Sequence, residues 1–313
     1  MVAGGEMQVE SVVLPKAGVH ICVCVCTYKR PDFLKRLLRE VSRQESGGLF
    51  SVSIAVVDND AEHSAEAVTA EMGSTLAVPV RYGVEPQRSI ARARNRVVAM
   101  ADGDYLAFID DDEFPAANWL LLLYTTCKEY KADGVLGPVL RHFEQTPPEW
   151  LQKSRFFTRP IYPTGLEVAW HDSRTSNVLV RRETVLGEEA PFRPQFRAGE
   201  DQDFFRRQIE RGFRFVWSDE AVVYETIPPN RWTRVYQIRR GLLQGACEVL
   251  QPSCDSKSIL KSVVAVPMYA AALPVALLFG QHHFMSLLEK MSYHAGKLLK
   301  RAGINPVREE YVS

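Results

Sequence analysis

The sequence lacks an excess of charge of either sign. Lys plus Arg and Asp plus Glu both number 38 in 313 residues. A balanced chain offers no overall basic field to a nucleic-acid backbone, so we expect no nucleic-acid partner. Residues 1–18 also lack a basic start followed by an apolar run, so no secretory signal is expected. We interpret these residues as a leader without chemistry.

Cysteine spacings typical of metal or redox sites are missing as well. None of the six cysteines forms a CxxC pair. Cys22, Cys24 and Cys26 alternate with valines, so in a strand they share one face and cannot readily bond to each other. We therefore interpret them as buried free thiols rather than metal ligands, which suits a reducing compartment.

Apolar runs alternate with helical patterns through most of the chain. Strands are predicted over residues 19–27, 51–57, 80–84, 105–109, 134–140, 176–182 and 213–217. Helices are predicted over residues 32–44, 64–72, 87–101, 115–130 and 204–211. Repeated strands and helices of this length indicate an α/β fold, with a mostly parallel, Rossmann-like sheet and helices on both faces. We expect a long, partly ordered loop over residues 141–173 that covers a site.

Acidic residues gather where the predicted strands end. Residues 110–113 are four consecutive acids after an apolar strand, and Asp58 with Asp60 follows another strand. A third pair, Glu200 with Asp201, comes just before the helix predicted over residues 204–211. Adjacent carboxylates repel one another unless a cation or hydrogen-bond donors compensate, although a solvated acidic turn is the simplest alternative. Since open α/β sheets bind ligands at their carboxyl edge, the acids predict one crevice suited to nucleotide-sugar transfer.

The C-terminal third changes character. Residues 262–280 carry no charge but include two prolines, and residues 284–301 form a basic amphipathic pattern. These segments predict attachment to a membrane surface, with a buried helical hairpin as the alternative. The arginines at 231, 234, 239 and 240 are interpreted either as a site for an acceptor diphosphate or lipid headgroups, or as a solvated helix face. We divide the chain into the leader 1–18, a catalytic domain 19–245 and a helical region 246–313.

Four motifs in this order resemble the inverting glycosyltransferases of family 2, with the GT-A fold, and in particular the bacterial exopolysaccharide type. They are VCVCTYKRP, VVDNDA, SIARARNRVVAMADGDYLAFIDDDE and GEDQDF, and the resemblance spans roughly residues 19–245. It implies a metal-dependent hexosyltransferase. The implied partners are a nucleotide-sugar donor, with a UDP-sugar expected, and a saccharide or lipid-linked acceptor.

The resemblance also implies roles for single residues. Thr27, Tyr28 and Asp58 would line the nucleotide pocket. Arg94 and Asn95 match an Ala-Arg-Asn element that contacts the nucleotide or its phosphates.

The metal and the base are implied in the same way. Asp110 and Asp112 match the Asp-Xaa-Asp motif that holds Mg or Mn, with Asp112 as the direct ligand and Asp110 nearer the ribose or sugar. Asp201 would be the general base that deprotonates the acceptor hydroxyl.

One departure narrows the expected activity. Processive synthases of the family carry a Gln-Xaa-Xaa-Arg-Trp motif, and this chain keeps only Arg231 and Trp232. We therefore expect addition of a single sugar, by a peripheral or monotopic enzyme at the cytoplasmic face of the inner membrane. A catalytically silent carbohydrate-binding or scaffold relative is one alternative. A sugar-phosphate nucleotidyltransferase is another, although residues 27–33 contain no glycine for a phosphate loop.

Overall fold

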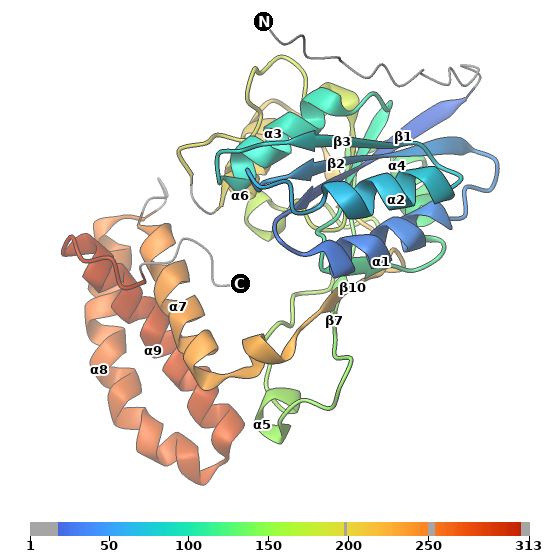
Figure 1. Cartoon of the computed structure of the whole chain (residues 1–313). Coiled ribbons are helices and arrows are strands. Elements are labelled where there is room, and N and C mark those ends of the chain that lie inside the picture. Colours follow the sequence, from blue (N-terminus) through green and yellow to red (C-terminus); the bar gives the residue numbers. More distant parts are fainter. Residues whose placement is uncertain (1–17, 197–198, 250–253, 308–313) are drawn as a thin grey trace, which may run out of the picture.

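The computed structural model of the chain describes residues 18–196, 199–249 and 254–307 (Figure 1). The predicted leader therefore lies, apart from Gly18, outside the described residues. Within them the chain builds an α/β unit followed by three long helices, which stand beside it.

The main sheet has seven strands in the order β3-β2-β1-β4-β8-β6-β9. Its strands are β1 Val19–Thr27, β2 Phe50–Asp58, β3 Val80–Val84, β4 Tyr105–Phe108, β6 Gly134–Leu136, β8 Val178–Arg181 and β9 Phe215–Trp217. β1, β2, β3 and β4 are parallel, and β8 runs antiparallel to both β4 and β6. The expected mostly parallel sheet is confirmed, with β8 as the reversed strand.

The single strand predicted over residues 134–140 is wrong. The structure divides it into β6 and β7 Val139–His142, which belong to different sheets. The break falls at Gly137 and Pro138. A Cβ on Gly137 would lie 2.4 Å from the Ala221 carbonyl oxygen, and proline cannot donate to a ladder. A second sheet, β5-β10-β7, was not predicted; it adds β5 Glu113–Pro115 and β10 Val223–Thr226.

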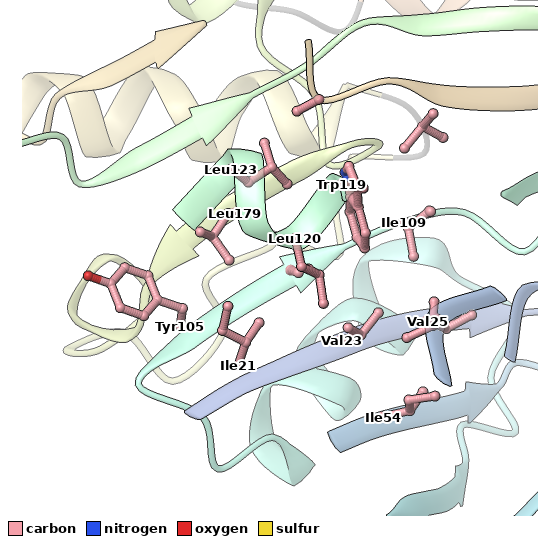
Figure 2. Close-up of a cluster of buried hydrophobic side chains, with 14 of the residues drawn as sticks. Ile21, Val23, Val25, Ile54, Tyr105, Ile109, Trp119, Leu120, Leu123 and Leu179 are labelled. Atoms are coloured by element: carbon pink, nitrogen blue, oxygen red, sulfur yellow. The ribbon is translucent and has the colours of Figure 1, made fainter. Parts of the chain in front are cut away.

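Helices cover both faces of the main sheet. α1 Pro31–Ser42, α2 Glu66–Thr75 and α4 Trp119–Glu129 pack on one face, and α3 Ile90–Met100 and α6 Glu200–Glu210 pack on the other. β1 shows why: Ile21, Val23 and Val25 point toward the first group, whereas Cys22 and Cys24 point toward the second. Figure 2 shows the first core, where leucines and the indole of α4 lie over β1 and β4.

The structure confirms that all six cysteines are free and that Cys22 and Cys24 are buried, whereas Cys26 is only partly buried.

The long loop between β7 and β8 contains two short helices. They are α5 Glu149–Gln152 and the 3-10 turn η1 Trp170–Asp172. Arg141, on β7, donates hydrogen bonds to the carbonyl oxygens of Leu151, Ser154 and Phe156 in this loop, at 3.0–3.3 Å. The loop is thus held by a partly buried guanidinium group. Two further 3-10 turns, η2 Arg182–Thr184 and η3 Pro229–Trp232, end β8 and precede the long helices.

The C-terminal unit consists of α7 Arg234–Glu248, α8 Ser256–Leu278 and α9 Gln281–Arg301. A boundary at residue 245 falls inside α7, which packs against α9 rather than against the sheet, and α9 packs in turn against α8. α8 is, among the described residues, the helix long and apolar enough to cross a membrane. It does form a hairpin with α9, but it is not buried: side chains exposed along it include Leu260, Val264, Met268, Val275 and Leu278.

Candidate active site

A cavity of about 330 Å³ opens at the carboxyl ends of β1 and β4. Its lining mixes acids with arginines and one aromatic ring. The lining residues are Cys26, Thr27, Tyr28, Arg30, Asn59, Arg88, Ile90, Arg94, Asp110, Asp111, Asp112, Glu225 and Arg231. Because parallel strands end at this edge, the turns after β1 and β4 bring residues far apart in sequence to one place.

Asp111 and Asp112 are buried in contact with arginines. Asp111 accepts a hydrogen bond from the Thr27 hydroxyl at 2.8 Å and from Arg30 Nη1 at 3.0 Å. Asp112 Oδ2 lies 3.1 Å from both Arg30 Nη1 and Arg231 Nη2. Burial, followed by the neighbouring Asp112 charge, raises the pKa of Asp111 to about 6, although Arg30 and Thr27 oppose this shift. The acidic turn is therefore an internal ion-pair network and not a solvated loop.

Glu113 and Asp110 lie on opposite sides of this turn. Glu113 is fully buried, accepts a hydrogen bond from the Ser176 hydroxyl at 2.5 Å, and accepts one from the Asp110 backbone N–H at 3.1 Å. Asp110 instead keeps 42% of its side chain exposed to the cavity. Displacement of water around its carboxyl raises the pKa of Asp110 more than the Arg94 charge lowers it. Glu113 thus fixes the backbone that presents Asp110.

Arg94 links α3 to α6. Its guanidinium forms an ion pair with the buried Glu200, and its Nη2 lies 3.8 Å from Asp110 Oδ1. Asp201 follows in the first turn of α6, where the helix dipole favours a carboxylate. The charge of Asp201 acts on Arg94 and on Arg174, so its carboxylate lies on the Arg94 side of the site. Asp201 is not among the residues that line the cavity.

Besides Asp201, two other predicted site residues lie outside the cavity lining. Asp58 is buried; its Oδ2 accepts hydrogen bonds from the Ala65 N–H at 2.7 Å and the Tyr82 hydroxyl at 3.1 Å. Asn95 exchanges two hydrogen bonds with the Phe192 backbone, at 2.7 and 2.9 Å. Both side chains hold loops of the fold in this structure.

Other predicted residues do gather in the cavity. They are Thr27, Tyr28, Arg94, Asp110 and Asp112. The Arg88 guanidinium lies 4.6 Å from the centre of the Tyr28 ring. Such a cation–π contact leaves an aromatic surface at the mouth of the cavity, on which a planar base can stack.

Several site residues were not predicted from the sequence. Glu225 lies in none of the four motifs, and Arg30 lies in the motif VCVCTYKRP but was given no role. The four C-terminal arginines were treated as one group, yet among them Arg231 lines this cavity, whereas Arg234 donates to Gln281 at 2.8 Å. Arg231 lies in the turn η3, before α7 begins, whereas Arg234 lies in α7.

The acids of the cavity fit a divalent metal only as part of a larger site. Among residues 18–196, 199–249 and 254–307, no three metal-binding side chains form a group. Asp110 and Asp112 nevertheless line one cavity from alternate positions of one turn. Mg²⁺ commonly takes one or two carboxylates and completes its octahedron with substrate phosphates and water. The donor set therefore suits Mg or Mn in company with a phosphate ligand.

Comparison with known proteins identifies the family of the chain. A family model described as Glycosyl transferase family 2 matches residues 22–188. The succinoglycan biosynthesis protein ExoM of Rhizobium meliloti (strain 1021) is 34% identical over 235 residues, which cover 74% of this chain and 75% of ExoM. Glycosyltransferase GlyG of Streptococcus pneumoniae serotype 4 (strain ATCC BAA-334 / TIGR4) is 23% identical over 206 residues, covering 65% of this chain and 64% of GlyG.

Solved structures share the fold. The mannosyltransferase PcManGT from Pyrobaculum calidifontis, in complex with GDP-Man and Mn²⁺, has a TM-score of 0.57 at 17% identity, over 92% of this chain and 87% of PcManGT. S. aureus TarS 1-349, in complex with UDP-GlcNAc, has a TM-score of 0.51 at 16% identity, over 92% and 93% of the two chains. The expected GT-A fold is thus confirmed. With the family match and the identity to ExoM, these findings show that the chain is a glycosyltransferase and belongs to glycosyl transferase family 2.

Proposed function

We propose that this glycosyltransferase moves a single sugar from a nucleotide-sugar donor to a saccharide or lipid-linked saccharide acceptor, with inversion, in bacterial cell-surface or exopolysaccharide biosynthesis. The observation that carries the proposal is the cavity at the ends of β1 and β4, where the acids at 110–112 face four arginines, at positions 30, 88, 94 and 231. A site of mixed charge suits a diphosphate whose own charge is shared between a cation and guanidinium groups.

The donor nucleotide fits the Tyr28 side of the cavity. The Tyr28 ring offers a stacking surface for a base, and Arg88 beside it can meet a phosphate. TarS was solved with UDP-GlcNAc and PcManGT with GDP-Man, which supports a nucleotide sugar in this fold. We propose a UDP-sugar as the donor of this chain, with Thr27 at the nucleotide. Asp58 and Asn95 would act indirectly, by holding the loops around it.

Asp110 and Asp112 would hold Mg or Mn, which supplies positive charge to the departing diphosphate when it is bound. Asp112 already lies between Arg30 and Arg231, so this carboxylate is fixed in orientation. The two guanidinium groups would then turn toward the phosphate oxygens that enter the cavity. Arg94 stays paired with Glu200 and brings one more positive charge to the Asp110 side.

Asp201 is the proposed general base. Inversion by single displacement needs a base on the face of the sugar opposite the departing diphosphate, and the charges of Asp201 and Asp110 both act on Arg94, which supports Asp201 as a residue of the same site. Its carboxylate would take the proton of the acceptor hydroxyl as the bond to the anomeric carbon forms. Asp201 Oδ1 accepts a hydrogen bond from the N–H of Gln202 at 2.8 Å, which orients it.

The helical unit is proposed to bring the enzyme to a membrane that carries its acceptor. At the hairpin turn Leu278 is 85% exposed and Phe279 is 72% exposed. Lys257, Lys261 and Lys290 line grooves beside the exposed apolar side chains of α8. Apolar residues flanked by lysines suit a monolayer with anionic headgroups. We propose peripheral or monotopic binding at the cytoplasmic face of the inner membrane.

A donor screen tests the proposed function. Purified protein is incubated with Mn²⁺ and a panel of UDP-, GDP- and dTDP-sugars, and release of nucleoside diphosphate is measured. The proposal expects slow metal-dependent release from one donor, most readily a UDP-sugar. No release or binding across the panel favours a silent carbohydrate-binding relative. Formation of sugar phosphate with nucleoside triphosphate, when pyrophosphate is added, identifies a nucleotidyltransferase.

A further inference from the structure

A second, smaller cavity lies at the same edge of the sheet, beyond β8, β6 and β9. Its volume is about 20 Å³, enough for one water-sized group such as a carboxylate oxygen. Arg159, Arg174, Ser176 and Trp217 line it, and none of these four lines the cavity at the ends of β1 and β4. The two cavities are therefore separate, although they share one sheet edge.

The two arginines of this cavity differ in their partners. Arg159 Nη2 donates to Glu225 at 3.0 Å, and its Nη1 donates to the Ser176 hydroxyl at 3.1 Å. Arg174 is half-buried, and no described residue accepts a hydrogen bond or an ion pair from its guanidinium. Its charge is thus held inside the protein without a direct counter-charge. Burial, and then the positive charge of Arg159, lower the pKa of Arg174 below its usual range.

One residue of the same lining carries a buried donor without a partner. Trp217 is 5% exposed, and its indole Nε1 is buried with no acceptor among the described residues. An unsatisfied buried N–H is unfavourable, so such a group is rare in a folded protein. The lining of the cavity therefore combines an unpaired guanidinium with a residue whose N–H donor is unpaired. Asp172, the acid that lines it, is already close to the Tyr162 hydroxyl and His171.

The cavity also borders the proposed reaction centre. Ser176 donates to Glu113, whose other oxygen accepts from the Asp110 N–H, so two hydrogen bonds separate the cavity from the residue nearest the sugar. The negative charge of Asp201, the proposed base, acts on the Arg174 guanidinium. The first cavity already offers a place for the nucleoside diphosphate. Since the charge of Asp201 acts on Arg174, an acceptor bound beside Arg174 would be near the proposed base.

We propose that Arg174, with Arg159 and the Trp217 Nε1, forms a subsite for an anionic substituent of the acceptor, either a carboxylate of an acidic sugar or a phosphate. This inference rests on the proposed transfer reaction. An oxygen of the anion accepts from the Trp217 N–H while Arg174 supplies the counter-charge, and both groups then gain the partner that the fold does not provide. The subsite selects an anionic acceptor over a neutral one and holds its hydroxyl beside Asp201.

Matched sugars test the proposal by calorimetry on the full-length protein loaded with UDP and Mn²⁺. The probes are glucuronate for the carboxylate source, glucose 1-phosphate for the phosphate source, and neutral glucose. We expect one anionic probe to bind at least about tenfold more tightly than glucose, since charge-assisted hydrogen bonds have this magnitude. The anionic probe that binds more tightly shows whether the subsite takes a carboxylate or a phosphate.

Three variants test whether the anionic probe binds at the subsite or only responds to positive charge on the protein surface. Arg174→Gln should reduce binding of the anionic probe to the level of glucose and leave UDP affinity unchanged. Trp217→Phe, which keeps the ring but removes the N–H, should weaken the same probe about threefold or more. Arg155→Gln is the matched control, because Arg155 is exposed on the same loop and lines neither cavity.

Three outcomes would overturn the proposal. They are equal binding of all three probes to wild type, an unchanged preference in Arg174→Gln, and an equal loss in Arg155→Gln. A fall in UDP affinity in Arg174→Gln would assign the arginine to the donor and also refute the subsite. If wild type fails to bind UDP at all, the proposed function fails instead, and the anion preference is then read on the unloaded protein.

Discussion

At the scale of residues, the four consecutive acids at 110–113 have four different environments. Asp111 is fixed by Thr27 and Arg30, and Glu113 points inward to Ser176. The family resemblance implied Asp110 and Asp112 as the metal pair, and both residues line one cavity in the structure. The sequence did not predict Arg30, because the partners are 81 residues apart and a charge pair carries no periodic signal. The exclusion of Asp58 and Asn95 from the cavity likewise depends on tertiary hydrogen bonds.

Substitution of the proposed base should separate binding from chemistry. Asp201→Asn keeps the shape of the side chain but cannot accept a proton. We expect donor affinity within about twofold of wild type and transfer reduced about 10²- to 10⁴-fold, the usual contribution of general-base catalysis. Calorimetry with donor and a steady-state transfer assay check the two parts. Wild-type turnover in this variant would remove Asp201 from the mechanism.

The raised pKa of Asp111 predicts a pH dependence of stability. The folded protein holds this proton more tightly than the unfolded chain, so the stabilisation is complete below pH 3.8 and is lost as the pH rises to about 6. Asp111→Asn cannot ionise. Its free energy of unfolding should therefore rise relative to wild type between pH 4 and pH 7, by on the order of 2 kcal/mol. Urea unfolding at both pH values checks this, and a difference that does not change with pH would contradict it.

At the scale of elements, the sequence predicted strands where apolar runs are continuous and helices where the apolar spacing is regular. It missed β10 and the division of residues 134–140, since short edge strands depend on partners that lie far along the chain. α6 begins at Glu200, so the predicted helix start at 204 is one turn late. A helix whose first turn is almost wholly acidic has little apolar periodicity there to reveal it.

Close packing of α7 against α9 depends on glycines. A Cβ on Gly245 would lie 1.9 Å from the Tyr293 carbonyl oxygen, so the helices must separate to admit one. Gly245→Ala should destabilise the helical unit by about 1–3 kcal/mol despite the better helix propensity of alanine. Thermal unfolding followed by circular dichroism measures this.

A glycine inside α2 is the matched control. A Cβ on Gly73 would meet nothing nearer than 3.8 Å, so Gly73→Ala should stabilise the protein by about 0.5–1 kcal/mol. If Gly245→Ala also stabilises the protein, then α7 and α9 do not pack as closely as described.

At the scale of the whole molecule, the α/β unit and the helical unit meet through a third apolar cluster. Leu151, Phe157 and Ile227 on one side pack with Tyr236 and Met285 on the other. The sequence indicated both units from their composition. It left the alternative of a buried hairpin open, because an apolar helix has the same composition in a protein core and at a membrane. In the structure the apolar side chains along α8 are exposed, so α8 is not a buried core helix.

The exposed hairpin turn predicts how the molecule meets lipid. Leu278→Asp with Phe279→Asp should reduce binding to vesicles rich in phosphatidylglycerol at least about tenfold, because two large apolar side chains no longer enter the monolayer. Co-sedimentation measures the bound fraction. Leu186→Asp, on the α/β unit and 50% exposed, should bind as wild type. Equal binding of the double variant would show that α8 is not the contact.

The most direct test of the active-site assignment is calorimetry of UDP binding with and without Mn²⁺, on wild type and Asp112→Asn. We predict that Mn²⁺ strengthens UDP binding to wild type at least about tenfold, since the cation shares its charge between the carboxylates and the diphosphate. Asp112→Asn should lose this gain while UDP alone still binds. Equal enhancement by Mn²⁺ in the two proteins, or no binding of UDP to wild type, would contradict the account.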